Sequence, residues 1–418
     1  MTDLEPIELV EPEPRRRPEH HITPQEWVHA NLFAGWFNSV LTVVFGTLLA
    51  WVAYRLVRFI LVSADWEVVR RNLRLFMVGR FPVDELWRLW SALYLVAAGL
   101  GFAFGAAARI ALDPALGVAP ATRGLAAGAR RFWPLLLAGA ALVSLTRTVL
   151  PGLLLAGAVV ALLAGRWLGG RVPRRVASWW WVVLVIVLFG ALQVVVAGDG
   201  VGWDDWGGLH LTVFVTVAGI ALAFPIGLVL ALGRRSRMPV IRWLSIIYIE
   251  VFRGVPLITL LFLGQFVIFF MFPTYFDPPG LLVRAMIAIV VFEAAYVAEV
   301  VRGGLQAVPK GQYEAAQALG LSSLATMRKI VLPQALRAVI PALVGQFISL
   351  YKDTSLLSVI GVLEILRVAG AAVTQPDFLG QGLDAVTLPF VGFLYWVGSY
   401  TMSRESRRIE RRLGVRAR

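Results

Sequence analysis

The sequence predicts an all-α polytopic membrane protein. Apolar residues make up 58% of the 418-residue chain, charged residues make up only 16%, and the mean hydropathy is +0.74. The apolar residues form repeated runs of membrane-spanning length, which no soluble core of this size requires. Because the backbone polar groups of a spanning segment must be bonded within the protein, we expect each run to be a helix.

The charge balance favours a membrane protein over a nucleic-acid-binding protein. The net charge of +13 comes mostly from arginine, and the arginines lie in loops beside apolar runs. Loops held on the anionic, cytoplasmic side of a membrane have this composition, so we expect no nucleic-acid partner. The chain has no cysteine, which excludes disulfides and thiolate metal sites. The adjacent His20 and His21 lie in a tail that fixes no coordination geometry, so we expect no metal.

The N-terminal half is expected to hold a tail and an extension of about four to five spans. Residues 1–30 are rich in Pro, Glu and Arg and lack apolar periodicity, which indicates a disordered cytoplasmic tail without a signal peptide. Residues 31–197 form the transmembrane extension. Its predicted spans are 36–54, 89–108, 133–165 and 179–197. Residues 55–88 alternate aromatic and basic side chains, a pattern typical of a segment that lies flat on a membrane surface.

The apolar run 133–165 is too long for one untilted span, and Pro151-Gly152 falls near its centre. We predict a helical hairpin that turns at Pro151, and the alternative is one long kinked helix. The hairpin gives ten spans with both termini inside, whereas the kinked helix gives nine. In the ten-span arrangement the basic segment 55–88 lies outside, which conflicts with the preference of basic loops for the inside.

Residues 198–403 are predicted to form a five-span core. Its spans are 211–232, 244–272, 281–301, 334–351 and 385–402. The loop 233–242 holds four arginines and the tail 404–418 holds seven, so both should lie inside the cell. The acidic, proline-rich loop 273–280 should lie outside. This assignment also places the polar stretch 309–333 inside.

The stretch Glu314–Pro333, EAAQALGLSSLATMRKIVLP, is polar and lies between two apolar runs. Its alanines are strong helix formers and leave a bare helix face. Gly320 suits the left-handed residue that ends a helix, and Ser322 or Ser323 can cap a second helix. Pro333 then ends the pattern. We therefore predict two short helices that meet at a corner.

The spacing within this stretch is specific. Glu-Ala-Ala is followed after three residues by Gly320, after nine more by Ile330, and after one more by Leu332-Pro333. The spacing resembles the signature of the permease subunits of ABC importers, in which a cytoplasmic loop docks into a groove on an ATPase subunit. The docking loop here would be 309–333. The ATPase-coupling residues that the resemblance implies are Glu314, Ala315, Ala316, Gly320, Ile330, Leu332 and Pro333.

Three further segments resemble the polar amino acid branch of that family. They are Ile249–Phe262 (IEVFRGVPLITLLF), Ala294–Gly320 (AAYVAEVVRGGLQAVPKGQYEAAQALG) and Lys352–Gly361 (KDTSLLSVIG). With its long extension, the whole chain resembles the longer permease subunit of a general L-amino acid transport system. Because the five-span core carries every matched segment, we expect the spans before about Val201 to be peripheral to the transport path.

The resemblance implies a set of partners. They are an ATPase dimer that carries ATP and magnesium, a periplasmic amino acid-binding protein, a second permease subunit that forms a heterodimer with this chain, and an L-amino acid moved across the inner membrane by alternating access. The chain itself should bind no cofactor. A phosphate-binding loop needs Ser or Thr after its lysine, but the three lysines here are followed by Gly311, Ile330 and Asp353.

Charges within or beside the core spans are candidates for the substrate path, because a charge in a bilayer is costly unless it faces a bundle interior or water. The candidates are Glu293, Tyr296, Glu299, Glu250 and Arg253, with Arg302, Lys352 and Asp353 as gating or structural residues. Glu299 and Arg302 are spaced as an ion pair on one helix face. Glu293 has no basic residue one turn away. It must find a partner on another helix or meet the ammonium group of an amino acid.

Two classes of function are consistent with these patterns. One is a transport subunit that is driven by a separate ATPase, and the other is a self-sufficient ion-coupled secondary transporter. An intramembrane enzyme is a weaker third interpretation, since the sequence presents no nucleophile–base pair or metal constellation. The docking loop favours the ATP-driven subunit, because an ion-coupled carrier has no need of it.

Overall fold

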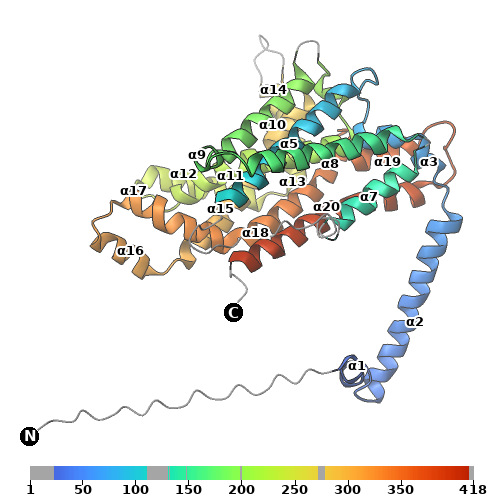
Figure 1. The fold of residues 1–418 in the computed structure, drawn as a ribbon, viewed down its shortest axis with the longest axis horizontal. Coiled ribbons are helices and arrows are strands. Elements are labelled where there is room, and N and C mark those ends of the chain that lie inside the picture. Colours follow the sequence, from blue (N-terminus) through green and yellow to red (C-terminus); the bar gives the residue numbers. More distant parts are fainter. Residues whose placement is uncertain are drawn as a thin grey trace, which may run out of the picture. The chain divides into compact units, whose positions relative to one another are not determined.

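The computed structural model describes residues 23–110, 130, 132–146, 148–197, 200–271 and 278–413 (Figure 1). Within these residues the regular elements are helices, and no strand forms. The chain divides into two compact units, Met1–Ala64 and Asp65–Arg418. The predicted all-helical membrane fold with a core and an N-terminal extension is confirmed.

The first unit contains α1 (Pro24–Leu32) and α2 (Trp36–Arg58), which ends in a π-helical turn, Phe59–Ser63. The span predicted at 36–54 is confirmed. The prediction of disorder up to residue 30 is wrong over α1, because Thr23 and Glu26 form a capping box at the start of this helix. Residues 1–22 of that tail lie outside the described residues.

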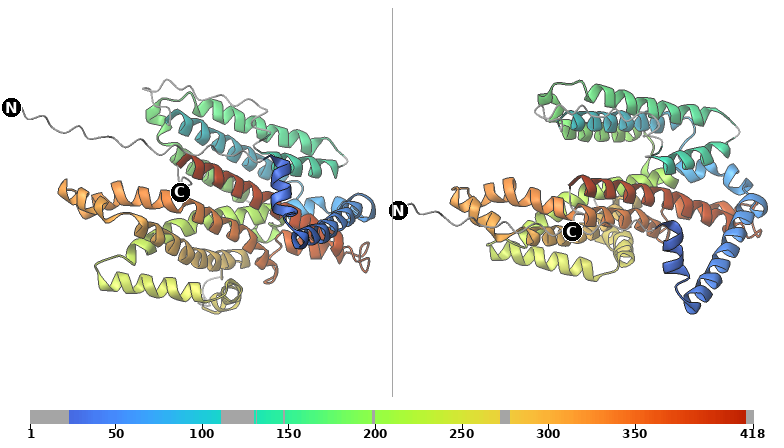
Figure 2. Two further views of the ribbon diagram at one scale, coloured as in Figure 1. Left: turned by 90° about the horizontal axis from the view of Figure 1, so that it is seen from below. Right: turned by 60° about the horizontal axis from the view of Figure 1, so that its bottom comes forward.

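The second unit contains two groups of packed helices (Figure 2). One group is the extension: α5 (Leu86–Ile110), α8 (Leu150–Gly169), α9 (Arg174–Ala177) and α10 (Trp180–Val196). The other is the core: α11 (Gly208–Gly233), α12 (Pro239–Gly254), α15 (Leu281–Ala307), α18 (Leu332–Asp353), α19 (Ile365–Val373) and α20 (Asp384–Leu413). By length and composition, six helices of the described chain are able to cross a membrane, or up to seven if one bent pair counts as a span.

The ends of the second unit carry different elements (Figure 1). At one end lie the short helices between α15 and α18, which we call the corner (Lys310–Val331). At the other, the loop end, lie the 3-10 turn Trp203–Asp205, α19 and the loop 374–383. The helices α11, α15, α18 and α20 run between these two ends.

Two helices form in place of one long kinked helix, as the predicted hairpin requires, but the chain turns before Leu150 rather than at Pro151, and the first helix, at 12 residues, is shorter than a membrane span. Helix α7 (Trp133–Ser144) ends before α8 begins at Leu150, and Pro151 lies in the first turn of α8. The Trp133 ring at the start of α7 packs against Tyr400 in the C-terminal half of α20, with ring centroids 5.7 Å apart. Since α8 begins at the loop end beside the start of α5, α7 and α8 run in opposite directions.

The span predicted over 244–272 is not one straight helix. Its first part is α12, and its second part comprises α13 (Leu257–Phe262), a π-helical turn (Leu263–Val267) and α14 (Ile268–Met271), which is bent by 103° from α12. The bend follows from Pro256. A proline forces the preceding residue out of helical geometry, and Val255 is accordingly extended, with ψ 134°.

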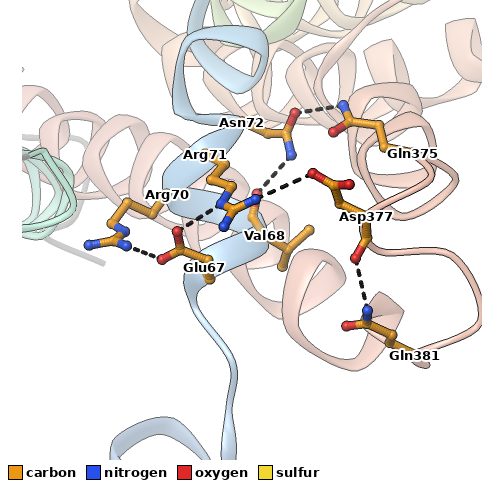
Figure 3. Close-up of polar contacts among 8 residues, drawn as sticks. All are labelled: Glu67, Val68, Arg70, Arg71, Asn72, Gln375, Asp377 and Gln381. Carbon is orange, nitrogen blue, oxygen red and sulfur yellow. Dashed lines mark hydrogen bonds and ion pairs between the residues drawn. The ribbon is translucent and has the colours of Figure 1, made fainter.

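Residues 65–81 are part of the core, which corrects the prediction that they lie flat on a membrane surface. Phe76 in α4 (Leu73–Val78) and Phe81 are 0% and 1% exposed, and the Phe76 ring meets Phe390 of α20 at 5.2 Å. Polar contacts fasten the same segment to the loop end (Figure 3). Arg71 of α3 (Glu67–Arg71) pairs with Asp377 at 3.3 Å, and the Gln375 amide donates to Asn72 at 2.7 Å.

This packing reduces the free charge of the basic segment. Gly79 bridges to Trp206 at the loop end, opposite the corner. The arginines of α3 do not stay as free charges there, because both Arg70 and Arg71 pair with Glu67. Arg88 pairs with Glu85 and donates to backbone carbonyls at the end of α10. Local ion pairs therefore neutralise Arg70, Arg71 and Arg88, whereas Arg74 and Arg80 are exposed.

The extension is held together by backbone contact between α5 and α8. A Cβ added to Gly101 would lie 2.0 Å from the Leu162 carbonyl oxygen, and one on Gly105 would lie 2.2 Å from that of Arg166. The facing Gly165 meets the Ala98 carbonyl oxygen in the same way, at 2.0 Å. Small residues four apart allow helices in a membrane to approach this closely, where dispersion forces replace the hydrophobic effect.

We predict that Gly101→Val separates α5 from α8. The added side chain overlaps backbone, which the helix cannot move aside, so overpacking should cost at least about 1–3 kcal/mol. Thermal unfolding of the purified protein in detergent measures the loss. Gly190→Val in α10 is the control, because a Cβ there meets nothing within 4 Å. Equal melting temperatures for the two variants would contradict the packing argument.

Candidate functional site

The corner begins with α16 (Lys310–Ala318) and turns at Gly320, which has φ +72°. This left-handed residue confirms the predicted helix stop. The Ser322 hydroxyl then accepts a hydrogen bond from Ala325 N at 3.3 Å and caps α17 (Ser323–Thr326), also as predicted. The two short helices and their turn are therefore built by local sequence signals.

The prediction that Pro333 ends the second helix is wrong. Helix α17 continues through a π-helical turn (Met327–Val331) into α18, so the helix is unbroken from Ser323 through Pro333. The π turn already interrupts the ladder of helical hydrogen bonds, so Pro333 in the next turn removes little. The corner is consequently joined to a membrane-spanning helix without a flexible joint.

The outer surface of the corner differs from the bare alanine face that we predicted. Glu314 and Ala315 are exposed, but Ala316 is 1% exposed and packs inside the corner. Leu319 and Leu324, on either side of the turn, are 79% and 78% exposed. Two leucines at the tip of a polar loop form an apolar contact surface that the sequence analysis missed. Ile330 and Leu332 are half-buried, whereas Pro333 is exposed.

Side chains connect the corner to three spans. Arg235, just after α11, donates to the Leu305 carbonyl in α15 and to the Tyr313 hydroxyl in α16, both at 3.1 Å. The Gln334 amide at the start of α18 donates to Gln312 of α16 at 3.1 Å. The corner is therefore linked by hydrogen bonds to the ends of α11 and α18, and through Arg235 to the end of α15.

Four of the predicted path residues form one charge cluster near the same end. Glu299 pairs with Arg302 at 2.5 Å, which confirms the predicted ion pair, and also lies 3.7 Å from both Arg253 and Arg234. Arg234 also pairs with Glu250 at 2.9 Å. Tyr296 joins the cluster: its hydroxyl donates to the Arg253 carbonyl at 3.5 Å. The cluster links α12 to α15.

Glu293 lies apart from this cluster. It is 1% exposed on α15, and its Oε2 accepts a hydrogen bond from the Gln346 amide of α18 at 3.1 Å. Its Oε1 is buried and has no hydrogen-bond partner among the described residues. The partner of Glu293 on the neighbouring helix is therefore the neutral amide of Gln346. The Oε1 atom of the carboxylate is left able to accept a hydrogen bond from another group.

The remaining candidates lie at the loop end. Lys352 is exposed and Asp353 is half-buried at the end of α18. Nearby Glu364, which we did not predict, is 0% exposed and caps α19 by accepting hydrogen bonds from the Leu366 and Arg367 amides. Burial raises the pKa of the Glu364 carboxyl to about 7. Its position directly before a short apolar helix was the sequence signal that could have predicted this capping role.

No metal centre accompanies these residues in the described part of the chain, where no three His, Cys, Asp or Glu side chains are placed to hold an ion. The adjacent His20 and His21 lie outside the described residues.

Comparison with known proteins identifies the family. Residues 223–413 match the family described as the binding-protein-dependent transport system inner membrane component. The chain is 34% identical over 422 residues to the inner membrane amino-acid ABC transporter permease protein YhdY of Escherichia coli (strain K12), and the match covers 96% of both proteins. The chain belongs to the ABC transporter permeases. This permease is thus a transport component of the inner membrane with several membrane-spanning helices.

Two further relatives separate the core from the extension. This permease is 34% identical to the glutamate/glutamine/aspartate/asparagine transport system permease protein BztC of Rhodobacter capsulatus. The match covers 96% of both proteins. The L-cystine transport system permease protein TcyB of Bacillus subtilis (strain 168) is 33% identical. The match covers 95% of TcyB but only 53% of this permease. A relative therefore exists whose length corresponds to little more than the core.

We predict that the Glu293–Gln346 contact behaves as a coupled pair. Gln346→Leu removes the donor to a buried carboxylate and should destabilise the permease by about 1–3 kcal/mol, whereas replacing both residues by leucine should cost less than the single change. Thermal unfolding of the single and double variants in detergent checks this. Additive losses would show that the two side chains do not interact.

Proposed function

We propose that this permease is the transmembrane subunit of an ATP-driven importer that moves L-amino acids across the inner membrane by alternating access. The observation that supports this most strongly is that the corner has an exposed apolar surface and is hydrogen-bonded to the ends of the spans. Its exposed Leu319 and Leu324 give a partner an apolar surface to contact. Its hydrogen bonds to three span ends would carry a push on that surface into the core.

The proposed complex contains four further components. An ATPase dimer docks on the corner and carries ATP and magnesium, and a periplasmic amino acid-binding protein delivers the substrate at the loop end. A second permease subunit completes the translocation path as a heterodimer. The substrate is an L-amino acid, as the names of the relatives suggest. The corner end and both termini would lie in the cytoplasm, and the basic loops at the corner end support this orientation.

Glu314, Ala315, Gly320 and the half-buried Ile330 and Leu332 would form or position the docking surface, with Ala316 and Pro333 shaping its backbone. Glu293 would face the substrate: its unpartnered Oε1 is suited to accept a hydrogen bond from an ammonium group. The charge cluster of Glu250, Arg253, Tyr296, Glu299 and Arg302 would hold the corner end of the path closed until the corner moves. Lys352 and Asp353 would take part in gating at the loop end.

Uptake in proteoliposomes separates this proposal from an ion-coupled carrier. The permease is reconstituted with its ATPase, second permease and binding protein, and labelled amino acid uptake is measured with ATP on the ATPase side. We expect uptake to require ATP and to persist when ionophores collapse all gradients. Uptake by the permease alone under an ion gradient would overturn the proposal.

We predict that the same substitution has different effects at two corner glycines. Gly320→Ala places a Cβ at a positive φ, at a cost of about 1–2 kcal/mol, and should weaken ATPase co-purification and lower ATP-driven uptake. Gly311→Ala in α16 meets open space and should leave both unchanged, or stabilise the permease by about 0.4–1 kcal/mol. Co-purification from membranes and uptake measure the difference. Wild-type coupling in the Gly320 variant would contradict a coupling role for the turn.

A further inference from the structure

A cavity of about 380 Å³ opens at the corner end and is lined mainly by arginine. Four arginine side chains, Ile246 and Gln306 form its wall. The arginines are Arg234, Arg235, Arg242 and Arg302. We propose that this cavity binds the phosphate group of an anionic phospholipid.

The charges around the cavity are unbalanced. Arg234 and Arg302 are held by Glu250 and Glu299, together with Arg253. Arg235 bonds only to a carbonyl and a hydroxyl, and Arg242 forms no ion pair within the described residues. Two carboxylates therefore face five guanidinium groups. An excess of arginine in a cavity this size calls for an anion with several oxygen atoms, and the planar guanidinium group fits phosphate by paired hydrogen bonds.

The position of the cavity favours a lipid as the source of that phosphate. Arg234 and Arg235 directly follow α11, and Arg302 lies in the last two turns of α15, so the cavity lies where two spanning helices end. Anionic headgroups occupy this level of the bilayer, and basic pockets between spanning helices bind them.

Helix α12 joins the cavity to an exposed apolar surface. It contributes Arg242 and Ile246 to the cavity, whereas its other side exposes an apolar row. In that row Val240, Trp243 and Leu244 are 70%, 62% and 63% exposed. A helix with an apolar outer face and a tryptophan lies against acyl chains at the interface. A lipid that packs its chains on this face would bring its headgroup to the arginines.

Lipid titration by native mass spectrometry tests the proposal on the full-length, delipidated permease. Phosphatidylglycerol, zwitterionic phosphatidylcholine and inorganic phosphate are added in separate arms. We expect phosphatidylglycerol to bind preferentially, and Arg242→Gln to weaken its binding on the order of tenfold, as the loss of one charged hydrogen-bonding group should. Arg242 lies outside the ion-pair cluster, so thermal unfolding of the variant should match that of the wild type.

Arg237→Gln is the matched control. It removes the same charge in the loop directly before α12, but Arg237 does not line the cavity. Binding reduced equally by the two substitutions would overturn the proposal, because general electrostatic attraction would then explain it. Undiminished phosphatidylglycerol binding by Arg242→Gln would also overturn the proposal. The arginines would then be assigned to contact with an acidic protein surface. Full displacement of the lipid by equimolar inorganic phosphate would assign the cavity to a soluble anion instead.

Discussion

Close packing around α15 is the constraint on which the rest of the core depends. Ala294, Ala295, Val297 and Ala298, which lie around the helix, are all 0% exposed, so neighbouring helices contact it on several sides. Helix α18 approaches through Gly304, where an added Cβ would lie 2.7 Å from the Ala335 carbonyl oxygen. Because such interfaces are close-packed, α15 and its neighbours resist gradual deformation. The corner follows directly from the end of this helix.

The extension contributes to the core in two different ways. Helices α5, α8 and α10 pack mainly on one another, which fits the expectation that these spans are peripheral. Residues 65–81 are different, since Phe76 and Phe81 fill the core and Arg71 pairs across to Asp377. A truncation at Ala197 would therefore remove core side chains as well as peripheral spans. Residues 65–81 therefore pack with the core of residues 198–403, although the peripheral spans separate the two segments in sequence.

The sequence predicted well what depends on local chemistry. Span positions followed from apolar runs, and the corner followed from the left-handed Gly320 and the serine cap. Prolines were harder to interpret, because the same ring bends the chain at Pro256 and is accommodated after a π turn at Pro333. Phe76 was misassigned because basic neighbours suggested a membrane surface, while those arginines pair locally. Contacts between helices, such as Glu293 with Gln346, depend on tertiary packing and leave no mark in one sequence.

The central claim is that the corner is a rigid continuation of the spans and contacts the ATPase in the cytoplasm. The chain has no native cysteine, so Leu324→Cys introduces a single reactive thiol at an exposed position of the corner. A membrane-impermeant maleimide is applied to right-side-out and inverted membrane vesicles, with and without the ATPase. We expect labelling only in inverted vesicles, and protection when the ATPase is bound. Labelling from the periplasmic side, or labelling that the ATPase does not reduce, would contradict the account.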